Sequence, residues 1–204
     1  LNQIRGHEYL AIFGLVEEFI LPFVLDHARP QLGGDDHRVR ALLQFAGEEA
    51  KHIHLFNEFR AEFGRGFGSP CGVIGPPEAI AAEVLRHDPL AVALAILQIE
   101  WMTQRHFIEC IRDDQGLDKQ FASMLRHHWM EEAQHAMLDT LMVAELAKGM
   151  PEAEIVSCVD GYLEIGAMID EGLKQQTLFD LTAMMMASGR RLGEGEHARL
   201  AEQQ

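Results

Sequence analysis

The stretch HHWMEEAQH, from His127 to His135, places three histidines and two glutamates within nine residues. Glu132 and His135 are three positions apart, so on a helix their side chains project from the same face. A carboxylate and an imidazole on one face can bind a metal ion together. A single Glu-x-x-His is a weak signal, because most such pairs are exposed polar residues. The pattern occurs a second time, however, in EEAKH from Glu48 to His52.

The two copies belong to an internal repeat with an offset of 83 residues, the distance from Glu49 to Glu132. The same offset lays Glu17 over Glu100, so each half has a lone glutamate 32 residues before its Glu-x-x-His. That separation lets the chain leave one helix, turn, and return to about the same height on the next. The candidate metal ligands are therefore Glu17, Glu49 and His52 in the first half and Glu100, Glu132 and His135 in the second.

The sequence around the lone glutamates favours a metal site over an exposed polar face. Glu100 lies in the apolar run AVALAILQIEWM, and Glu17 lies in AIFGLVEEFILPFV. A carboxylate in such a run is costly to bury unless it is paired or bound to metal. Four helices could then bring four glutamates and two histidines to one interior point, the arrangement of di-iron and di-manganese carboxylate bundles.

The first ligand is either Glu17 or Glu18, and the repeat favours Glu17. Glu17 matches Glu100, whereas Glu18 matches Trp101. The face of the helix that carries Glu17 is also apolar and suited to the bundle interior; it carries Leu10, Phe13, Ile20 and Val24.

Two further glutamates are candidates for the outer partners of the histidines. Ligating histidines usually donate their second ring N–H to a carboxylate, a carbonyl or water. Glu48 and Glu131 each precede a candidate ligand, and we expect Glu48 to bond His135 and Glu131 to bond His52. The alternative is that both glutamates face solvent.

His128 makes the two halves unequal. It lies four residues before Glu132 and shares its helix face, while its counterpart in the repeat is Phe45. His128 is therefore a candidate third imidazole ligand; the alternative is a buried histidine satisfied by a neighbour. His127 lies about 100° further round the helix and is expected off the site.

The rest of the chain reads as helix, with no strand-like alternation. We expect an all-α fold: a four-helix bundle with a long crossover at Gly64–Pro77, whose length lets the second and third long helices run parallel. Asp35 or Asp36 should cap the second helix. One domain is expected over residues 1–204, with the bundle core at about 3–148, an accessory helical region at 152–188 and a polar, frayed tail at 189–204. The expected helices span about 3–28, 36–63, 77–86, 90–113, 119–148 and 152–188.

The charge and composition of the chain argue against several classes of partner and of fold. The formal net charge of -15 argues against a nucleic acid or an anionic membrane as partner. Such an acidic surplus also arises when carboxylates serve bound cations. The three cysteines are far apart, which argues against a disulfide framework and favours a reducing cytosol. No apolar run reaches the length of a membrane span, so a cytoplasmic protein is expected.

The segment from Glu17 to His135 resembles the ferritin-like di-iron carboxylate superfamily, whose pattern is Glu, Glu-x-x-His, Glu, Glu-x-x-His. With His128, the second motif becomes His-x-x-x-Glu-x-x-His and looks like the arylamine (p-aminobenzoate) N-oxygenase branch. The resemblance implies a ferritin-like bundle with two iron ions, with manganese or a mixed iron–manganese pair as alternatives. It also implies dioxygen as a reactant, an amine as substrate and an extra histidine as seventh protein ligand.

The leading hypothesis is a dioxygen-activating di-iron oxidase or oxygenase that acts on a small organic substrate. Its electron donor is unidentified, and a homodimer is expected. One iron would be held by Glu17, Glu49 and His52, and the other by Glu100, Glu132, His135 and His128, with Glu49 and Glu132 as bridges. The alternatives are an iron-binding, ferroxidase or storage protein, a manganese catalase-like peroxide enzyme, and a bundle without metal.

Overall fold

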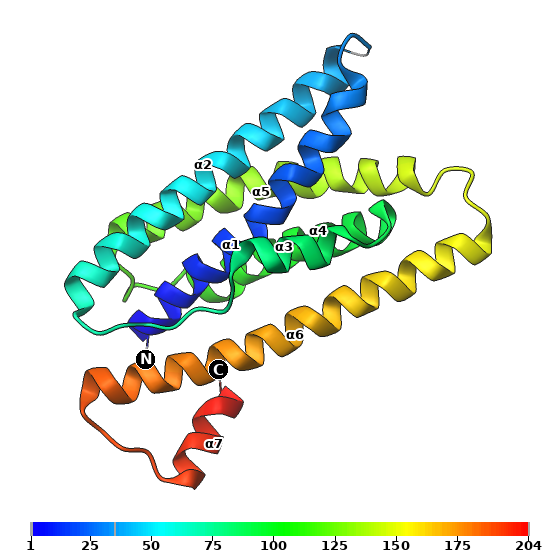
Figure 1. The fold of residues 1–204 in the computed structure, drawn as a ribbon. Coiled ribbons are helices and arrows are strands. Elements are labelled where there is room, and N and C mark those ends of the chain that lie inside the picture. Colours follow the sequence, from blue (N-terminus) through cyan, green and yellow to red (C-terminus); the bar gives the residue numbers. More distant parts are fainter. Residues whose placement is uncertain (1, 35, 204) are drawn as a thin grey trace.

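The computed structural model describes residues 2–34 and 36–203, and all regular secondary structure in those ranges is helical. The expected all-α class is confirmed (Figure 1). The elements are α1 (Asn2–Ala28), η1 (Arg29–Gln31), α2 (Asp36–Phe67), α3 (Pro77–Leu85), α4 (Pro89–His106), η2 (Phe107–Ile111), α5 (Lys119–Leu146), α6 (Glu152–Ser188) and α7 (Glu194–Gln203).

Four long helices form two antiparallel pairs, α1 with α2 and α4 with α5, each joined by a short connection. Two ring contacts show how the pairs meet. Phe45 stacks on His135 with centroids 4.0 Å apart, and His52 meets His128 at 4.6 Å. Residue numbers rise along α2 between these contacts and fall along α5, so the two helices are antiparallel. Helices α2 and α4 are therefore parallel, as the length of the crossover predicts.

The interior face of α1 is the one that the sequence indicates. Leu10, Ile20 and Val24 are buried along it together with Glu17. Because these residues recur at helical spacing, burying their apolar side chains brings the carboxylate inside with them. Pro22 lies within α1, which continues as helix on both sides of it.

Aspartate caps determine where two of the long helices begin. Asp118 accepts hydrogen bonds from the backbone N–H groups of Gln120 and Phe121 at 2.9 and 3.0 Å, and so caps α5. Asp88 caps α4 through the N–H of Leu90 at 2.9 Å. In α4 a proline follows the cap as the first helical residue, where its missing N–H costs no hydrogen bond.

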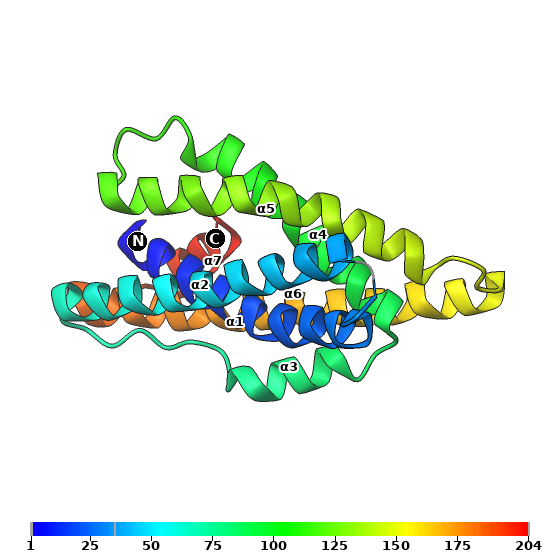
Figure 2. The same cartoon turned by 90° about the horizontal axis from the view of Figure 1, so that it is seen from above.

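The remaining helices lie outside the four-helix core. Seen from above, α3 lies beyond α1 and α2, on the side away from α5 (Figure 2). Helix α6 runs along the outside of the bundle, and α7 turns back beside its C-terminal end (Figure 1). Gln176 of α6 holds the crossover: its Oε1 accepts from the N–H of Ile74 at 3.0 Å, and its Nε2 donates to the Gly72 carbonyl at 3.0 Å.

Two boundaries differ from the sequence-based expectation. Helix α2 continues to Phe67, about one turn further than expected. Helix α4 ends at His106 and continues as a π-helical turn, in which the Arg112 N–H donates to the Phe107 carbonyl at 2.9 Å. Asp36 is the first residue of α2, and Asp35 lies outside the described residues.

The expectation of a frayed tail is wrong for residues 194–203, which form α7. His197, Leu200 and Ala201 are half-buried at helical spacing, so one face of α7 packs on α6.

Within the described ranges, no helix is both long enough and apolar enough to cross a membrane.

Candidate metal centre

The seven predicted ligands come together in the middle of the bundle, and all are buried. They form two groups in which one nitrogen or oxygen atom of each residue lies within 4.8 Å of the others. The first group is Glu17, His52, His128 and Glu132, and the second is Glu49, Glu100, Glu132 and His135.

In the first group, two imidazole nitrogens face two carboxylates. His128 Nε2 lies 2.5 Å from Glu132 Oε1 and 3.4 Å from Glu17 Oε1. His52 Nδ1 lies 3.2 Å from the same Glu132 oxygen and 3.7 Å from Glu17 Oε1. Helices α1, α2 and α5 each contribute to this group.

In the second group, one imidazole nitrogen faces three carboxylates. His135 Nδ1 lies 2.8 Å from Glu132 Oε2, 2.8 Å from Glu49 Oε1 and 4.0 Å from Glu100 Oε1. Glu132 therefore turns one oxygen to each group. A carboxylate placed in this way is able to bind one cation in each group.

The structure corrects two details of the sequence-based assignment. His128 lies with Glu17 and His52, whereas we expected it beside Glu100 and His135. The reason is the antiparallel packing of α2 and α5: a residue one turn before Glu132 is level with residues after Glu49, where His52 lies. Of the two expected bridges, only Glu132 belongs to both groups, and Glu49 lies with the second alone.

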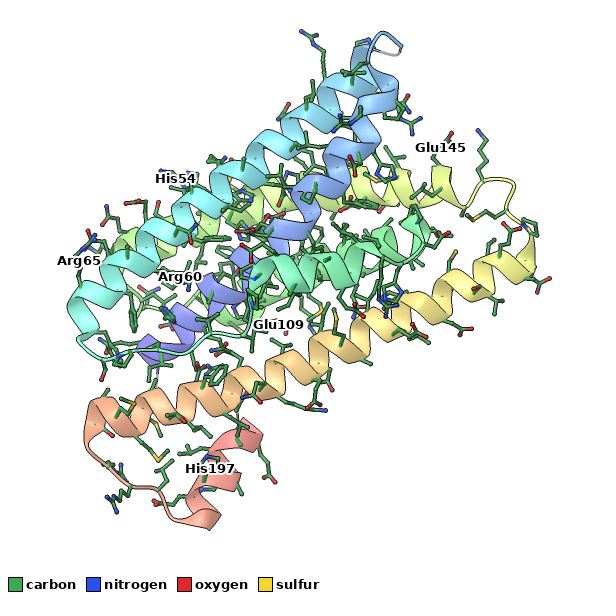
Figure 3. The ribbon with its side chains drawn as sticks, viewed as in Figure 1. His54, Arg60, Arg65, Glu109, Glu145 and His197 are labelled. Carbon is green, nitrogen blue, oxygen red and sulfur yellow. The ribbon has the colours of Figure 1, made fainter. Side chains whose placement is uncertain are left out.

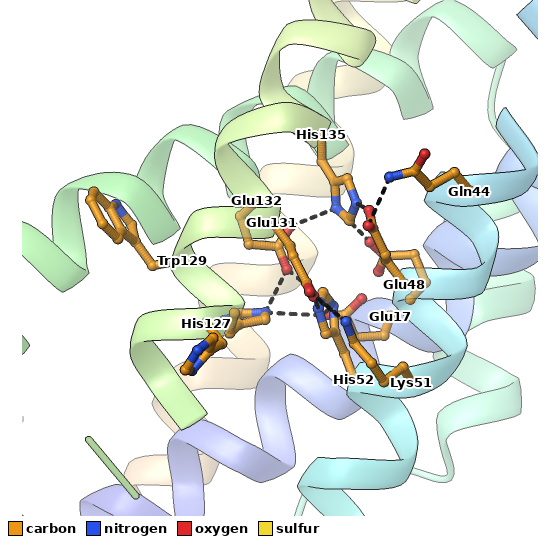
Figure 4. Close-up of polar contacts among 12 residues, drawn as sticks. Glu17, Gln44, Glu48, Lys51, His52, His127, Trp129, Glu131, Glu132 and His135 are labelled. Atoms are coloured by element: carbon orange, nitrogen blue, oxygen red, sulfur yellow. Dashed lines mark hydrogen bonds and ion pairs between the residues drawn. The ribbon is translucent and has the colours of Figure 1, made fainter. Parts of the chain in front are cut away.

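Glu48 and Glu131 lie where they were expected as outer partners of the histidines (Figure 4). His135 Nε2 lies 2.9 Å from Glu48 Oε2, and His52 Nε2 lies 2.8 Å from Glu131 Oε2. A carboxylate only accepts, so each outer glutamate accepts a hydrogen bond from Nε2 of its histidine, and with metal bound the deprotonated Nδ1 of each ring would face the cluster. Each pair joins one half of the repeat to the other, because α2 and α5 face each other.

The outer carboxylates differ in their own partners, a feature that the sequence analysis missed. Lys51 Nζ donates to both oxygens of Glu131 at 2.5 Å. Glu48 instead accepts a hydrogen bond from the neutral amide of Gln44 at 3.1 Å. The lysine could have been identified by comparing the repeats, since the residue in its place in the second half is Gln134.

Aromatic rings fix the orientation of His128. Phe13 and Phe56 meet its ring nearly edge-on, with centroids 5.6 and 5.0 Å away. In the other half, Phe45 occupies the corresponding place and stacks on His135. His128 Nδ1 is buried without a hydrogen-bond partner, so this imidazole has no outer acceptor.

The residues adjacent in sequence to Glu17 and His128 lie outside the cluster. Glu17 is 2% exposed within the cluster, whereas Glu18 is half-buried and lines a pocket on another face of α1. His127 lies off the cluster in Figure 4, and its Nδ1 lies 2.7 Å from the Ser123 carbonyl. The structure thus distinguishes Glu17 from Glu18 and His128 from His127 by burial.

Without metal, the cluster balances its charges with protons. Burial raises the pKa of Glu100 well above its ordinary value, and the adjacent Glu132 carboxylate adds to that shift. Burial acts on Glu132 in the same direction, but His128 and His135 outweigh it and hold the pKa of Glu132 well below its usual range. At His128, burial opposes the charged form, yet the Glu132 and Glu17 carboxylates raise the pKa to about 9.

The residues fit a pair of divalent cations. Glu17 Oε2 and Glu49 Oε2 are buried and have no hydrogen-bond partner. Such groups are rare in proteins and call for an explanation, of which a bound ion is one. The four ligand glutamates carry four negative charges when ionised, which two divalent ions would neutralise. The donor set combines carboxylate oxygen with imidazole nitrogen, and both are ordinary ligands of divalent metal ions in proteins.

Asp139 is a buried acid beside the cluster that the sequence analysis missed. It is 1% exposed, and its Oδ2 has no hydrogen-bond partner. Burial raises its pKa to about 8, with His135 opposing the shift and Glu132 adding to it. The sequence could have indicated Asp139, because it lies one turn after His135 on the same helix face.

A cavity of about 610 Å³ lies between α1, the crossover and α6. Its lining includes Val16 and Phe19 but none of the seven predicted ligands.

Searches of protein-family models, of curated proteins and of solved structures find no match to the chain.

Proposed function

We propose that the protein is a ferritin-like di-metal carboxylate enzyme that uses two iron ions and dioxygen to oxidise a small organic substrate such as an amine. The observation that carries this proposal is Glu132, which offers one oxygen to each of two groups of buried donors. Two ferrous ions bound there would supply the electrons that reduce dioxygen.

The side chains of the protein would bind the two ions, orient the ligand histidines and shield the centre from water. In this proposal Glu17, His52 and His128 hold one ion, Glu49, Glu100 and His135 hold the other, and Glu132 bridges them. Glu48 and Glu131 keep the protons of His135 and His52 on the outer nitrogens, so that the inner nitrogens remain available to metal. The rings of Phe13, Phe45 and Phe56 exclude water from both ends of the cluster. The amine is suggested by the resemblance that His128 carries.

Metal analysis tests the di-metal site directly. Protein loaded with Fe(II) under anaerobic conditions should hold about two ions per chain. Glu17→Ala should lose metal, while Glu18→Ala, one residue away on another face, should keep both ions. Protein that binds no metal, or two variants with equal metal content, would refute the site.

Three reactivity assays on the loaded protein separate the enzyme from its alternatives. Oxygen consumption that depends on an added arylamine, with an oxidised amine as product, supports the proposal. Consumption that depends only on excess Fe(II), in particles of cage-like mass, would indicate iron storage. Oxygen release from peroxide by the manganese-loaded protein would indicate a catalase-like enzyme.

We also propose that the protein is a homodimer. Large apolar side chains are exposed on α4 and α5, including Trp101 at 60%, Met137 at 65% and Leu141 at 61%. Burying such surface between two copies would be favourable. Sedimentation analysis over a range of concentrations checks this, and a monomer throughout would contradict it.

A further inference from the structure

We infer that the two metal positions differ in selectivity, with a stronger preference for iron over manganese at the first position than at the second. The first position is the group around His52 and His128, and the second is the group around His135. The inference rests on the proposed di-metal site and gives the two parts of it different metal preferences.

The donor atoms are the first reason. The first position offers two imidazole nitrogens and two carboxylates, and the second offers one imidazole nitrogen and three carboxylates. Divalent iron binds most protein sites more tightly than manganese does, and imidazole nitrogen suits iron, whereas carboxylate oxygen suits manganese. The selectivity for iron should therefore be larger at the first position than at the second.

The inequality comes from a single replacement within the repeat. A chain that kept the repeat strictly would place equivalent side chains at 45 and 128 and would build two alike positions. Here Phe45 stacks on His135 and offers no donor, while His128 turns Nε2 toward Glu17 and Glu132. One half therefore gains a nitrogen donor at a place that the other half fills with a hydrocarbon ring.

The outer partners reinforce the difference. Near the first position, the Lys51 ammonium ion neutralises the Glu131 carboxylate, which accepts from His52. Near the second position, Glu48 accepts from His135 and from the neutral amide of Gln44. More uncompensated negative charge thus surrounds the second position. Its environment is oxygen-rich and ionic, which favours a hard cation such as manganese.

The experiment is competitive loading of metal-free protein with equal amounts of Fe(II) and Mn(II) in the absence of oxygen. Metal analysis gives the total content, and anomalous diffraction at the iron and manganese absorption edges gives the occupancy of each position. We expect a higher iron-to-manganese ratio at the first position than at the second. Equal ratios at the two positions would overturn the inference.

Two reciprocal variants test whether the residues at positions 45 and 128 cause the difference in metal ratio between the two positions. His128→Phe copies the other half and should bring the ratio at the first position down toward that of the second. Phe45→His supplies an imidazole beside His135 and should raise the ratio at the second position. Either variant alone suffices if the other does not fold, and an unchanged ratio in a folded variant would overturn the inference. Failure to bind any metal would instead refute the proposed function.

Discussion

Glu48 illustrates how much a metal centre depends on a residue that need not touch the metal. Its carboxylate accepts from His135 Nε2 at 2.9 Å and so fixes which ring nitrogen faces the cluster. The repeat places Glu48 at this position, but the sequence left open whether it faces solvent. In the structure Glu48 faces inward, because the packing of α2 against α5 brings its carboxylate to His135, which is distant in sequence.

We predict that Glu48→Ala weakens metal binding at the second position by about 10- to 100-fold, the usual effect of removing an outer partner of a ligand histidine. Titration of metal-free protein against a competing chelator would measure the affinity. Glu145→Ala is a suitable control, since Glu145 lies exposed near the C-terminal end of α5 and pairs with Lys148 (Figure 3). Equal affinities in the two variants would show that Glu48 has no role in binding.

Asp139 gives the metal-free protein a predictable dependence on pH. Its pKa of about 8 in the folded chain exceeds the unfolded value of about 3.9. Between those values the folded state binds more protons than the unfolded state, so stability decreases as pH rises through this window. Full titration of one such group changes the free energy of unfolding by up to about 1.4 kcal/mol per pH unit.

Asp139→Asn removes that contribution, so the unfolding free energy of the metal-free variant should decrease less steeply between pH 5 and 8. Urea unfolding at several pH values would measure both slopes. His135, whose pKa is also raised by Glu132 and Glu48 against the effect of burial, contributes a slope of the same sign in both proteins. Identical slopes would mean that Asp139 does not titrate in this range.

At the scale of elements, the crossover between α2 and α4 depends on one side chain. Gln176 is fully buried and bonds the backbone at Ile74 and Gly72 as well as Asp180, where its Nε2 donates to Oδ1 at 2.9 Å. Residues 68–76 have no regular secondary structure. Their backbone groups therefore need other hydrogen-bond partners, and Gln176 supplies two of them.

We predict that Gln176→Leu lowers the free energy of unfolding by about 1–3 kcal/mol, because it leaves partly buried backbone groups without partners. Chemical denaturation would measure the loss, and limited proteolysis would report whether the crossover becomes more accessible. The neighbouring Gln175→Leu is the control, because Gln175 is exposed and makes none of these bonds. A loss of equal size in both variants would argue against the role of Gln176.

Helix identities follow from the sequence better than helix ends do. Periodic apolar residues and the Asp88 and Asp118 caps indicate α4 and α5, since these signals act within a few residues. The π-helical turn after His106 and the packing of α7 do not follow, because both depend on contacts between helices. Phe107, for example, stacks on Trp129 of α5 with centroids 4.6 Å apart.

At the scale of the whole molecule, the cluster couples metal binding to folding. Residues from α1, α2, α4 and α5 meet there, so unfolding would separate every ligand. A ligand that binds only the folded state stabilises it by about 2.7 kcal/mol at a hundred times its dissociation constant.

We therefore predict that removing metal with a chelator lowers the melting temperature by roughly 5–10 °C for each occupied position, given the usual scaling for a chain of this length. Calorimetry before chelation, after chelation and after reloading would measure the change. Glu132→Ala should show little response to the chelator, because it lacks the shared ligand. A melting temperature that chelation leaves unchanged would contradict the coupling.

The sequence by itself determined the helical class, the repeat and the identity of the seven clustered residues. These follow from local rules: the helical period places Glu132 and His135 on one face, and the apolar run around Glu100 makes an unpaired carboxylate there costly. Such signals are carried by residues that are close in the chain.

Only the tertiary structure decided how the seven residues divide into two groups. The grouping of His128 with His52, the single shared carboxylate of Glu132 and the pairing of Lys51 with Glu131 all depend on the direction and height at which α5 packs against α2. Sequence spacing fixes positions along one helix. It does not fix the level at which two helices meet, because that is set by the packing of all their side chains together.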